Sequence, residues 1–273
     1  MTLTMGTGPF GEQRAGVFNA GLSAPEHLLY FEPIGKRVRA SFGGETVADS
    51  TRVWMLHETG HLPVYYFPFD DVCTELLERS DHVTHCPVKG DASYWTLAAG
   101  ERRAENAVWA YERPIESASW LAGHVAFYWD AVDAWFEEDE QVFVHPRDPY
   151  HRIDVLASSR HVRVSRDGEL LAESWRPRLL FETGLPVRYY LSRQDVRHDL
   201  LAPSMSVTRC PYKGVAEYWS VRVGDDVVPD LVWTYAEPLH DALAVRGMLC
   251  FYNEQVDVEV DGQREQRPTT PFA

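Results

Sequence analysis

Residues 86–95 read CPVKGDASYW, and residues 210–219 repeat this stretch as CPYKGVAEYW. The two stretches are offset by 124 residues, and the same offset relates further matches that run without a gap from about residue 38 to residue 133. These include Val38-Arg39, Glu58-Thr59-Gly60, Tyr65-Tyr66, Trp109, Tyr111 and Phe127-Tyr128, whose partners are Val162-Arg163, Glu182-Thr183-Gly184, Tyr189-Tyr190, Trp233, Tyr235 and Phe251-Tyr252. Self-similarity at a fixed offset indicates a tandem duplication of one domain.

Each copy has the pattern of a mainly β domain. Apolar residues alternate at Val38/Ala40 and at Val125/Phe127, as in strands with one buried face. Gly43-Gly44 and Asp167-Gly168 separate the first two such segments of each copy, and both dipeptides are typical of hairpin turns. No alternation of strands with long helices appears, which argues against a doubly wound nucleotide-binding fold.

One short helix is expected in each copy. Ser192-Arg193-Gln194-Asp195 resembles a capping box, and Val196 and Leu200 follow it at helical spacing. The counterpart in the first copy begins at Pro68 and continues through Val72 and Leu76. The expected fold is therefore mainly β, with two tandem homologous small β-barrel or sandwich domains that each contain one short helix.

The repeat also suggests where the domains begin and end. We expect an N-terminal arm at 1–36, a first domain at 37–136, an ordered linker at 137–160, a second domain at 161–260 and a C-terminal tail at 261–273. The linker contains two prolines where a flexible linker would be rich in Gly and Ser. It is interpreted either as a packed connector or as a source of ligands for a site between the domains.

Composition restricts the class of protein. Of 273 residues, 45% are apolar and 25% are charged, as in folded soluble proteins. Lys and Arg number 26 against 41 Asp and Glu, and the resulting net charge of −15 argues against nucleic acid as a partner. No apolar stretch is long enough for a membrane span, the N-terminus lacks the features of a secretory signal, and four cysteines are too few for a disulfide framework. We expect a cytoplasmic protein, and the oligomeric state stays open.

A matched cysteine and lysine give the strongest chemical signal. The chain has only three lysines (Lys36, Lys89 and Lys213) against 23 arginines, yet both copies place a lysine three residues after a cysteine. A lysine there could activate the thiol of Cys86 or act as a nucleophile itself, with Glu58 or His85 transferring protons. The alternative is structural: a buried thiol beside a turn in which the lysine forms an ion pair.

The candidate catalytic residues are thus Cys86, Lys89, Glu58 and His85. Aromatic side chains could line a ligand cavity beside them, although such residues more often fill a β core. The candidate ligand-binding residues are Tyr66, Tyr94, Trp109, Cys210, Lys213, Glu182 and Tyr190. A small molecule is the expected partner, the identity of any cofactor stays open, and a non-catalytic protein-interaction module is the alternative.

Histidines are distributed unequally. His57, His82 and His85 have no histidine at the matched positions of the second copy, so a metal-dependent enzyme confined to the first copy is a second alternative. The spacing is not specific, because neighbouring strand residues point to opposite faces, and we assign no metal ligands. The common nucleotide-binding, hydrolase and metalloprotease motifs are absent from the sequence.

The matched segments resemble DUF427, a family of domains of unknown function. The resemblance lies in Tyr66-Phe67-Pro68, Asp71-Val72, residues 86–90 and 92–95, and Trp109-Ala110-Tyr111, and it extends from about residue 38 to residue 257. It implies the tandem form of the family found in bacteria. Some classifications label the family nucleotidyltransferase-like, but such enzymes need a Gly-Ser turn followed by paired carboxylates, and this sequence has no Gly-Ser dipeptide. The second copy departs from the family pattern at Leu191-Ser192, which puts its activity in doubt.

Overall fold

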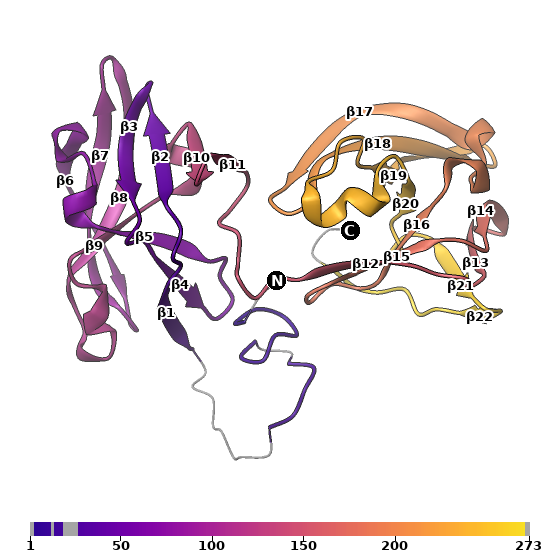
Figure 1. Cartoon of the computed structure of the whole chain (residues 1–273), viewed down its shortest axis with the longest axis horizontal. Helices are drawn as coiled ribbons and strands as arrows, with labels where there is room; N and C mark the ends of the chain where they lie inside the picture. The colour runs from indigo at the N-terminus through magenta and orange to yellow at the C-terminus, as the bar shows by residue number, and fades with distance from the viewer. Residues whose placement is uncertain (1–2, 12–13, 19–26, 271–273) are drawn as a thin grey trace. The chain divides into compact units, whose positions relative to one another are not determined.

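The structure is a computed structural model that describes residues 3–11, 14–18 and 27–270. The chain forms two compact units, Met1–Pro149 and Tyr150–Ala273, here called the first and second unit (Figure 1). Both are mainly β, as the sequence predicted, and their paired strands are antiparallel. None of the helices in the described part has the length and apolar character needed to cross a membrane.

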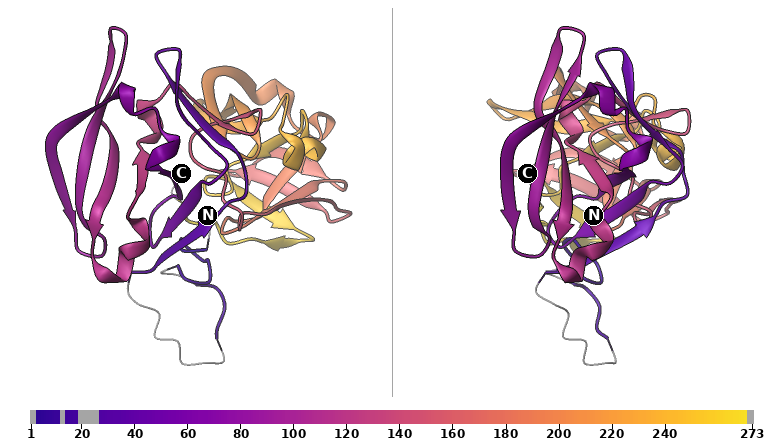
Figure 2. Two further views of the ribbon diagram at one scale, coloured as in Figure 1. Left: turned by 60° about the vertical axis from the view of Figure 1, so that its left-hand side comes forward. Right: turned by 90° about the vertical axis from the view of Figure 1, so that its left-hand side faces the viewer.

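The first unit contains a seven-stranded and a four-stranded sheet. The seven-stranded sheet has the order β1-β4-β5-β9-β8-β7-β6, and its long strands β6, β7 and β8 run side by side (Figure 2). Its strands are β1 (Leu29–Pro33), β4 (Trp54–Glu58), β5 (Val64–Pro68), β6 (Leu77–Cys86), β7 (Gly90–Ala99), β8 (Arg102–Pro114) and β9 (His124–Phe127). The four-stranded sheet has the order β11-β10-β2-β3 and comprises β2 (Val38–Phe42), β3 (Glu45–Ser50), β10 (Ala134–Glu137) and β11 (Glu140–Val142).

The second unit repeats this arrangement. Its seven-stranded sheet has the order β12-β15-β16-β20-β19-β18-β17, and its four-stranded sheet the order β14-β13-β21-β22. The strands are β12 (Ile153–Ala157), β13 (Val162–Arg166), β14 (Glu169–Ser174), β15 (Arg178–Glu182), β16 (Arg188–Leu191), β17 (Leu201–Cys210), β18 (Gly214–Val223), β19 (Asp226–Thr234), β20 (Leu249–Phe251), β21 (Asp257–Val260) and β22 (Gln263–Arg264). The tandem duplication predicted from the sequence is therefore visible strand by strand.

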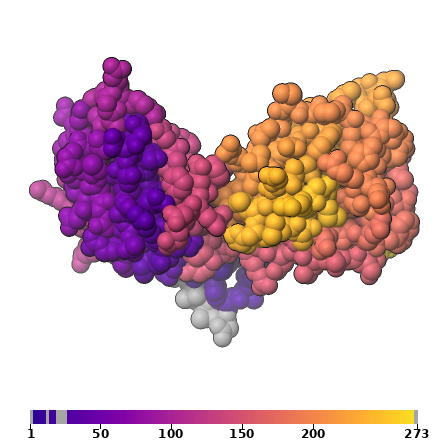
Figure 3. All heavy atoms as spheres, turned by 45° about the horizontal axis from the view of Figure 1, so that its top comes forward, coloured from indigo at the N-terminus to yellow at the C-terminus, as the bar shows by residue number. Residues whose placement is uncertain are grey.

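The two sheets of each unit face each other as in a sandwich, and neither closes into a barrel in the described part. In the first unit, Val38, Ala40 and Phe42 of β2 are buried in one core with Phe67 and Leu97 of the larger sheet. Arg39 and Ser41 alternate with them and are less buried, whereas β3 buries the neighbours Val47 and Ala48 opposite an irregularity of register; the dark band of these strands reaches the surface of the unit (Figure 3). The alternation of apolar residues in the sequence thus marks the face of β2 that enters the core.

Both predicted hairpin turns are present. Gly43 and Gly44 have φ angles of +63° and +86°, and Asp167 and Gly168 have +51° and +85°. Two successive positive φ values are those of a type I′ turn, whose twist matches that of the flanking strands. These turns join β2 to β3 and β13 to β14.

The predicted helical segment is present, but as two short turns and not as one continuous helix. Two separate 3₁₀ turns, Arg193–Asp195 and His198–Leu200, occupy this segment, and the Ser192 side chain makes no capping bond. Val196 lies between them with extended backbone (φ −117°, ψ 142°) and forms an isolated antiparallel bridge with Ala172. The Val196 amide closes the first turn on the Arg193 carbonyl at 3.3 Å, and the next amide, of Arg197, donates to Leu171 of β14 at 2.9 Å. Backbone pairing to β14 therefore ends the helical turn at this β-branched residue, while Val196 and Leu200 still enter the core. The first unit has the same pair of turns at Phe69–Asp71 and Thr74–Leu76.

The second face of each seven-stranded sheet carries a smaller aromatic cluster. In the first unit it contains Tyr66, Tyr94 and Tyr111, with Trp109 and Cys86 packed against it. The 3₁₀ segment η3 (Glu116–Leu121) covers part of this cluster with Ala118 and Leu121. We refer to it below as the outer aromatic face, and the corresponding face of the second unit is covered in part by η7 (His240–Val245).

Candidate functional site

Lys89 is positioned by a tight turn between β6 and β7. The Lys89 amide donates to the Cys86 carbonyl at 3.2 Å, and the Lys89 carbonyl accepts from the Ile115 amide at 3.1 Å. Gly90 follows with a φ of +102°, and a Cβ there would lie 3.3 Å from the Ile115 nitrogen. The sequence Pro-x-Lys-Gly therefore fixes the lysine backbone and leaves the side chain directed inward, with the residue only 8% exposed.

The Lys89 ammonium contacts the carboxylate of Glu58, the last residue of β4. The other carboxylate oxygen lies 2.8 Å from Nε2 of His27. Lys89 also lies over the Tyr111 ring, with Nζ 5.7 Å from its centroid. Lys89, Glu58 and His27 form one cluster at the edge of the outer aromatic face, called here the Lys–Glu–His cluster; Lys89 and Glu58 are buried, and the His27 side chain is 33% exposed.

The second unit contains the same cluster. Lys213 contacts both carboxylate oxygens of Glu182, and Nε2 of His151 lies 3.0 Å from Oε1. The three side chains are at most 11% exposed, so this cluster is deeply buried. Each member lies 124 residues after its counterpart in the first unit.

Sequence reasoning missed the two histidines. His27 and His151 obey the offset of the repeat, but they precede the aligned region, and residue 151 was assigned to the linker. The signal that could have found them is the constant spacing of 31 residues between each histidine and the glutamate it contacts.

The cluster favours ionised carboxylates. Burial alone would raise the pKa of Glu58, but hydrogen bonds from Lys89 and His27 and the lysine charge outweigh it and lower this pKa. The same balance lowers the pKa of Glu182 to about 2, where the opposing contributions come from His151 and Lys213. A lysine held against an ionised carboxylate donates hydrogen bonds and charge, and it is not arranged as the free amine that nucleophilic catalysis requires.

The aromatic side chains predicted to bind ligand lie on the outer aromatic face. The Trp109 indole N–H points to the Tyr66 hydroxyl at 3.3 Å, and the Trp109 ring lies 4.6 Å from that of Tyr128. The Tyr94 hydroxyl is 2.8 Å from the Thr84 hydroxyl. Tyr66 is fully buried, whereas Tyr128 is 50% exposed, so the face has a solvent-accessible end.

A family model matches two parts of the chain, and each part contains most of one unit's two sheets. The model of the domain of unknown function DUF427 matches residues 30–138 and 154–262. The chain belongs to the DUF427 family. A comparison with curated proteins returned no match. Each matched part of this chain contains the lysine and the glutamate of one Lys–Glu–His cluster and one outer aromatic face, whereas His27 and His151 lie three residues before the matched ranges.

Two further candidates of the first DUF427 domain lie on different sides of β6. Cys86 is partly buried and packs against the outer aromatic face. His85 is exposed, and its Nδ1 lies 2.7 Å from the Asp91 carboxylate. The alternation of strand side chains therefore places His85 with Asp91 and away from Lys89, whereas Cys86 shares the face of the candidate site.

The histidines considered as metal ligands are dispersed. His57 is buried on β4 and its Nε2 lies 3.0 Å from Glu32, His82 contacts the ring of Tyr94, and His85 pairs with Asp91. Among the described residues, no group of three or more His, Cys, Asp or Glu side chains is placed to hold a metal ion.

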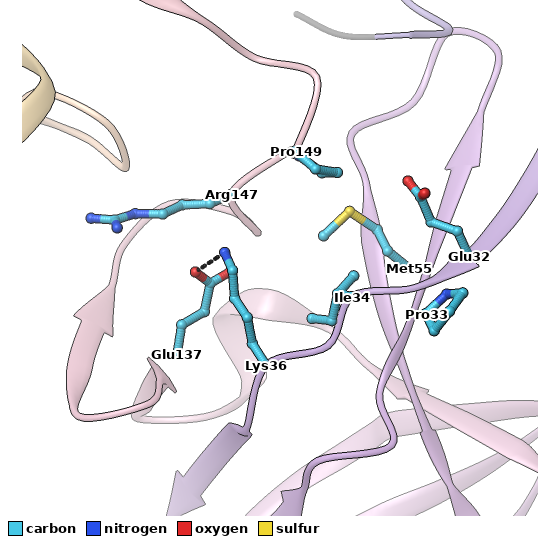
Figure 4. Close-up of a pocket in the computed structure, with 8 residues that line it drawn as sticks. All are labelled: Glu32, Pro33, Ile34, Lys36, Met55, Glu137, Arg147 and Pro149. Atoms are coloured by element: carbon cyan, nitrogen blue, oxygen red, sulfur yellow. Dashed lines mark hydrogen bonds and ion pairs between the residues drawn. The ribbon is translucent and has the colours of Figure 1, made fainter.

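A small cavity in the first unit lies apart from this site. It measures about 90 Å³ and is lined by Glu32, Pro33, Ile34, Lys36, Met55, Glu137, Arg147 and Pro149 (Figure 4). Lys36 and Glu137 point toward each other at 2.7 Å, and the Tyr65 hydroxyl donates to the same carboxylate at 2.5 Å. All three lysines of the chain thus contact a buried glutamate. Lys36 differs from the other two because it lines this cavity.

Cys250 gives a test of how fully the second outer face is closed. It takes the place of Ala126 of the first unit and is completely buried on β20. Burial raises the pKa of its thiol to about 12. We expect iodoacetamide at pH 8 to leave Cys250 unmodified in the native protein, because reaction requires an exposed thiolate. Peptide mass spectrometry measures this, with urea-denatured protein as the control in which all four cysteines react.

Proposed function

We propose that the outer aromatic face of the first unit binds a small molecule beside the Lys–Glu–His cluster. The observation that carries this proposal is the open end of the face: Tyr128 is half exposed while Tyr94, Tyr111 and the Lys89 and Glu58 pair behind it are buried. Aromatic walls with a few fixed polar groups are the usual composition of small-molecule sites. The four-stranded sheet packs on the opposite side, so this face is available without disturbing the main core.

Binding is better supported than covalent chemistry at Cys86 or Lys89. Glu58 and His27 hold the lysine in a satisfied ion pair, which supplies a fixed charge pattern rather than a reactive amine. His85, proposed as a proton-transfer partner, pairs with Asp91 on the other side of the strand. We therefore assign Lys89 and Glu58 the role of fixing the inner wall of the site, with Tyr66, Tyr94 and Trp109 as its aromatic lining.

A fragment screen by NMR tests the proposal. We expect bound fragments to shift the indole N–H signal of Trp109 and to bind about five-fold more weakly to Tyr128→Ala, because an aromatic wall contributes on the order of 1 kcal/mol. Trp175→Ala, which removes a 61% exposed aromatic ring of the second unit, is the matched control and should leave affinity unchanged. Fragments that bind elsewhere, or equally well to Tyr128→Ala, would contradict the proposal.

A further inference from the structure

The second outer aromatic face contains a buried arginine that the first one lacks. In the second unit, the guanidinium carbon of Arg188 lies 5.4 Å from the ring centroid of Trp233 and 5.9 Å from that of Tyr252. Glu254 accepts two parallel hydrogen bonds from this guanidinium, both 2.7 Å long. Arg188 and Glu254 are only 7% and 6% exposed in their side chains. The face thus contains a complete guanidinium site whose occupant is part of the chain.

The first unit has the same rings without the arginine. Trp109 and Tyr128 have the centroid separation of Trp233 and Tyr252, 4.6 Å in both cases, with interplanar angles of 42° and 51°. Val64 replaces Arg188 at the same point of the sheet, since Leu56 pairs with Val64 as Leu180 pairs with Arg188. Within the part of the chain that the structure describes, no Lys or Arg lies over Trp109 or Tyr128.

A carboxylate also occupies the matched position of the first unit. Asp130 follows Tyr128 by two residues, as Glu254 follows Tyr252, and the two turns are alike: the Ala131 amide donates to the Tyr128 carbonyl at 3.1 Å, as the Gln255 amide donates to the Tyr252 carbonyl at 2.8 Å. Asp130 is exposed and has no ion-pair partner among the described residues, whereas Glu254 is engaged by Arg188. Tyr128 is half exposed, and Tyr252 is covered further by the arginine. The first unit therefore combines an accessible ring pair with an unengaged carboxylate.

We propose that the Trp109–Tyr128 ring pair and Asp130 of the first unit bind the guanidinium group of a small-molecule ligand, in the way that the second unit binds its own Arg188. The inference rests on the proposed function and names its ligand class. A planar guanidinium stacks on aromatic rings and pairs with one carboxylate through two bonds, which a compact ammonium cannot do.

Isothermal titration calorimetry of the full chain with N-acetyl-arginine amide tests this, with N-acetyl-citrulline amide as the neutral isosteric ligand. We expect one site per chain and at least ten-fold weaker binding of the citrulline compound. The double variant V64R/D130E transplants the internal occupant into the first unit and should abolish binding. Equal affinity for the two compounds, no binding of either, or unchanged binding to V64R/D130E would overturn the proposal.

The reverse transplant gives an independent result if V64R/D130E does not fold. R188V/E254D removes the occupant of the second unit, and the expected stoichiometry for N-acetyl-arginine amide rises from one to two. A stoichiometry that stays at one contradicts the equivalence of the two faces. Fragments that depend on Tyr128 but show no preference for a guanidinium would overturn this inference and leave the proposed small-molecule function standing.

Discussion

Replacing Lys213 by methionine is expected to lower the free energy of unfolding by about 3–5 kcal/mol. Glu182 is 4% exposed in its side chain and receives its charge compensation chiefly from Lys213 and His151. Without the lysine, a buried carboxylate keeps its charge without a full partner or must take up a proton, and either outcome destabilises the folded state. Urea denaturation followed by circular dichroism measures the loss.

The matched control is Arg197→Met in the same unit. Arg197 also loses an ion pair, to Asp199, but both side chains are at least half exposed. Such a pair contributes about 0–1 kcal/mol, because water screens it. The double variant Lys213→Met/Glu182→Gln should recover much of the loss, since it removes both charges while the amide oxygen can still accept from His151. A Lys213→Met protein as stable as Arg197→Met would show that burial of the cluster does not govern its energetics.

The tandem architecture could be predicted because a sequence repeat can be recognised without any assumption about structure. A constant offset of 124 residues equates the two halves, and the dipeptides at 43–44 and 167–168 locate the first hairpins. The backbone at Val196 was not predicted from the local sequence. A capping-box pattern suggested a continuous helix, but Val196 has extended backbone and bridges to Ala172. Sequence spacing alone does not reveal that a neighbouring strand offers a backbone partner.

The candidate site was only partly predictable for a related reason. Lys89 and Glu58 stood out as matched residues 31 positions apart, and the structure brings them into contact. His27 escaped notice because few identities surround it, although β1 places it beside Glu58 by pairing Leu29 with Glu58. The sequence also did not reveal that the difference between Val64 and Arg188 has a chemical meaning, since a valine and an arginine are both ordinary in a strand. Only the rings beneath them give the substitution a chemical meaning.

The same cluster should make stability depend on acidic pH. The pKa of Glu182 is lowered to about 2 in the folded protein, against an ordinary value of about 4.3 in an unfolded chain. A carboxyl group with a depressed pKa stabilises the fold fully above its unfolded value, and this contribution declines as the pH falls toward the folded value. The total is about 3 kcal/mol, of which about 1 kcal/mol is lost between pH 6 and pH 3.5.

Glu182→Gln isolates this contribution from those of other acidic groups. At pH 7 the variant is less stable than the parent chain, because Lys213 and His151 face a neutral amide. As the pH falls, Glu182 of the parent takes up a proton and comes to resemble the amide, so the difference in unfolding free energy between the two proteins narrows. Urea titrations of both proteins from pH 7 to pH 3.5 measure that difference. A constant difference across this range would mean that Glu182 retains an ordinary pKa, and that the Lys–Glu–His cluster does not hold its carboxylate in the charged form.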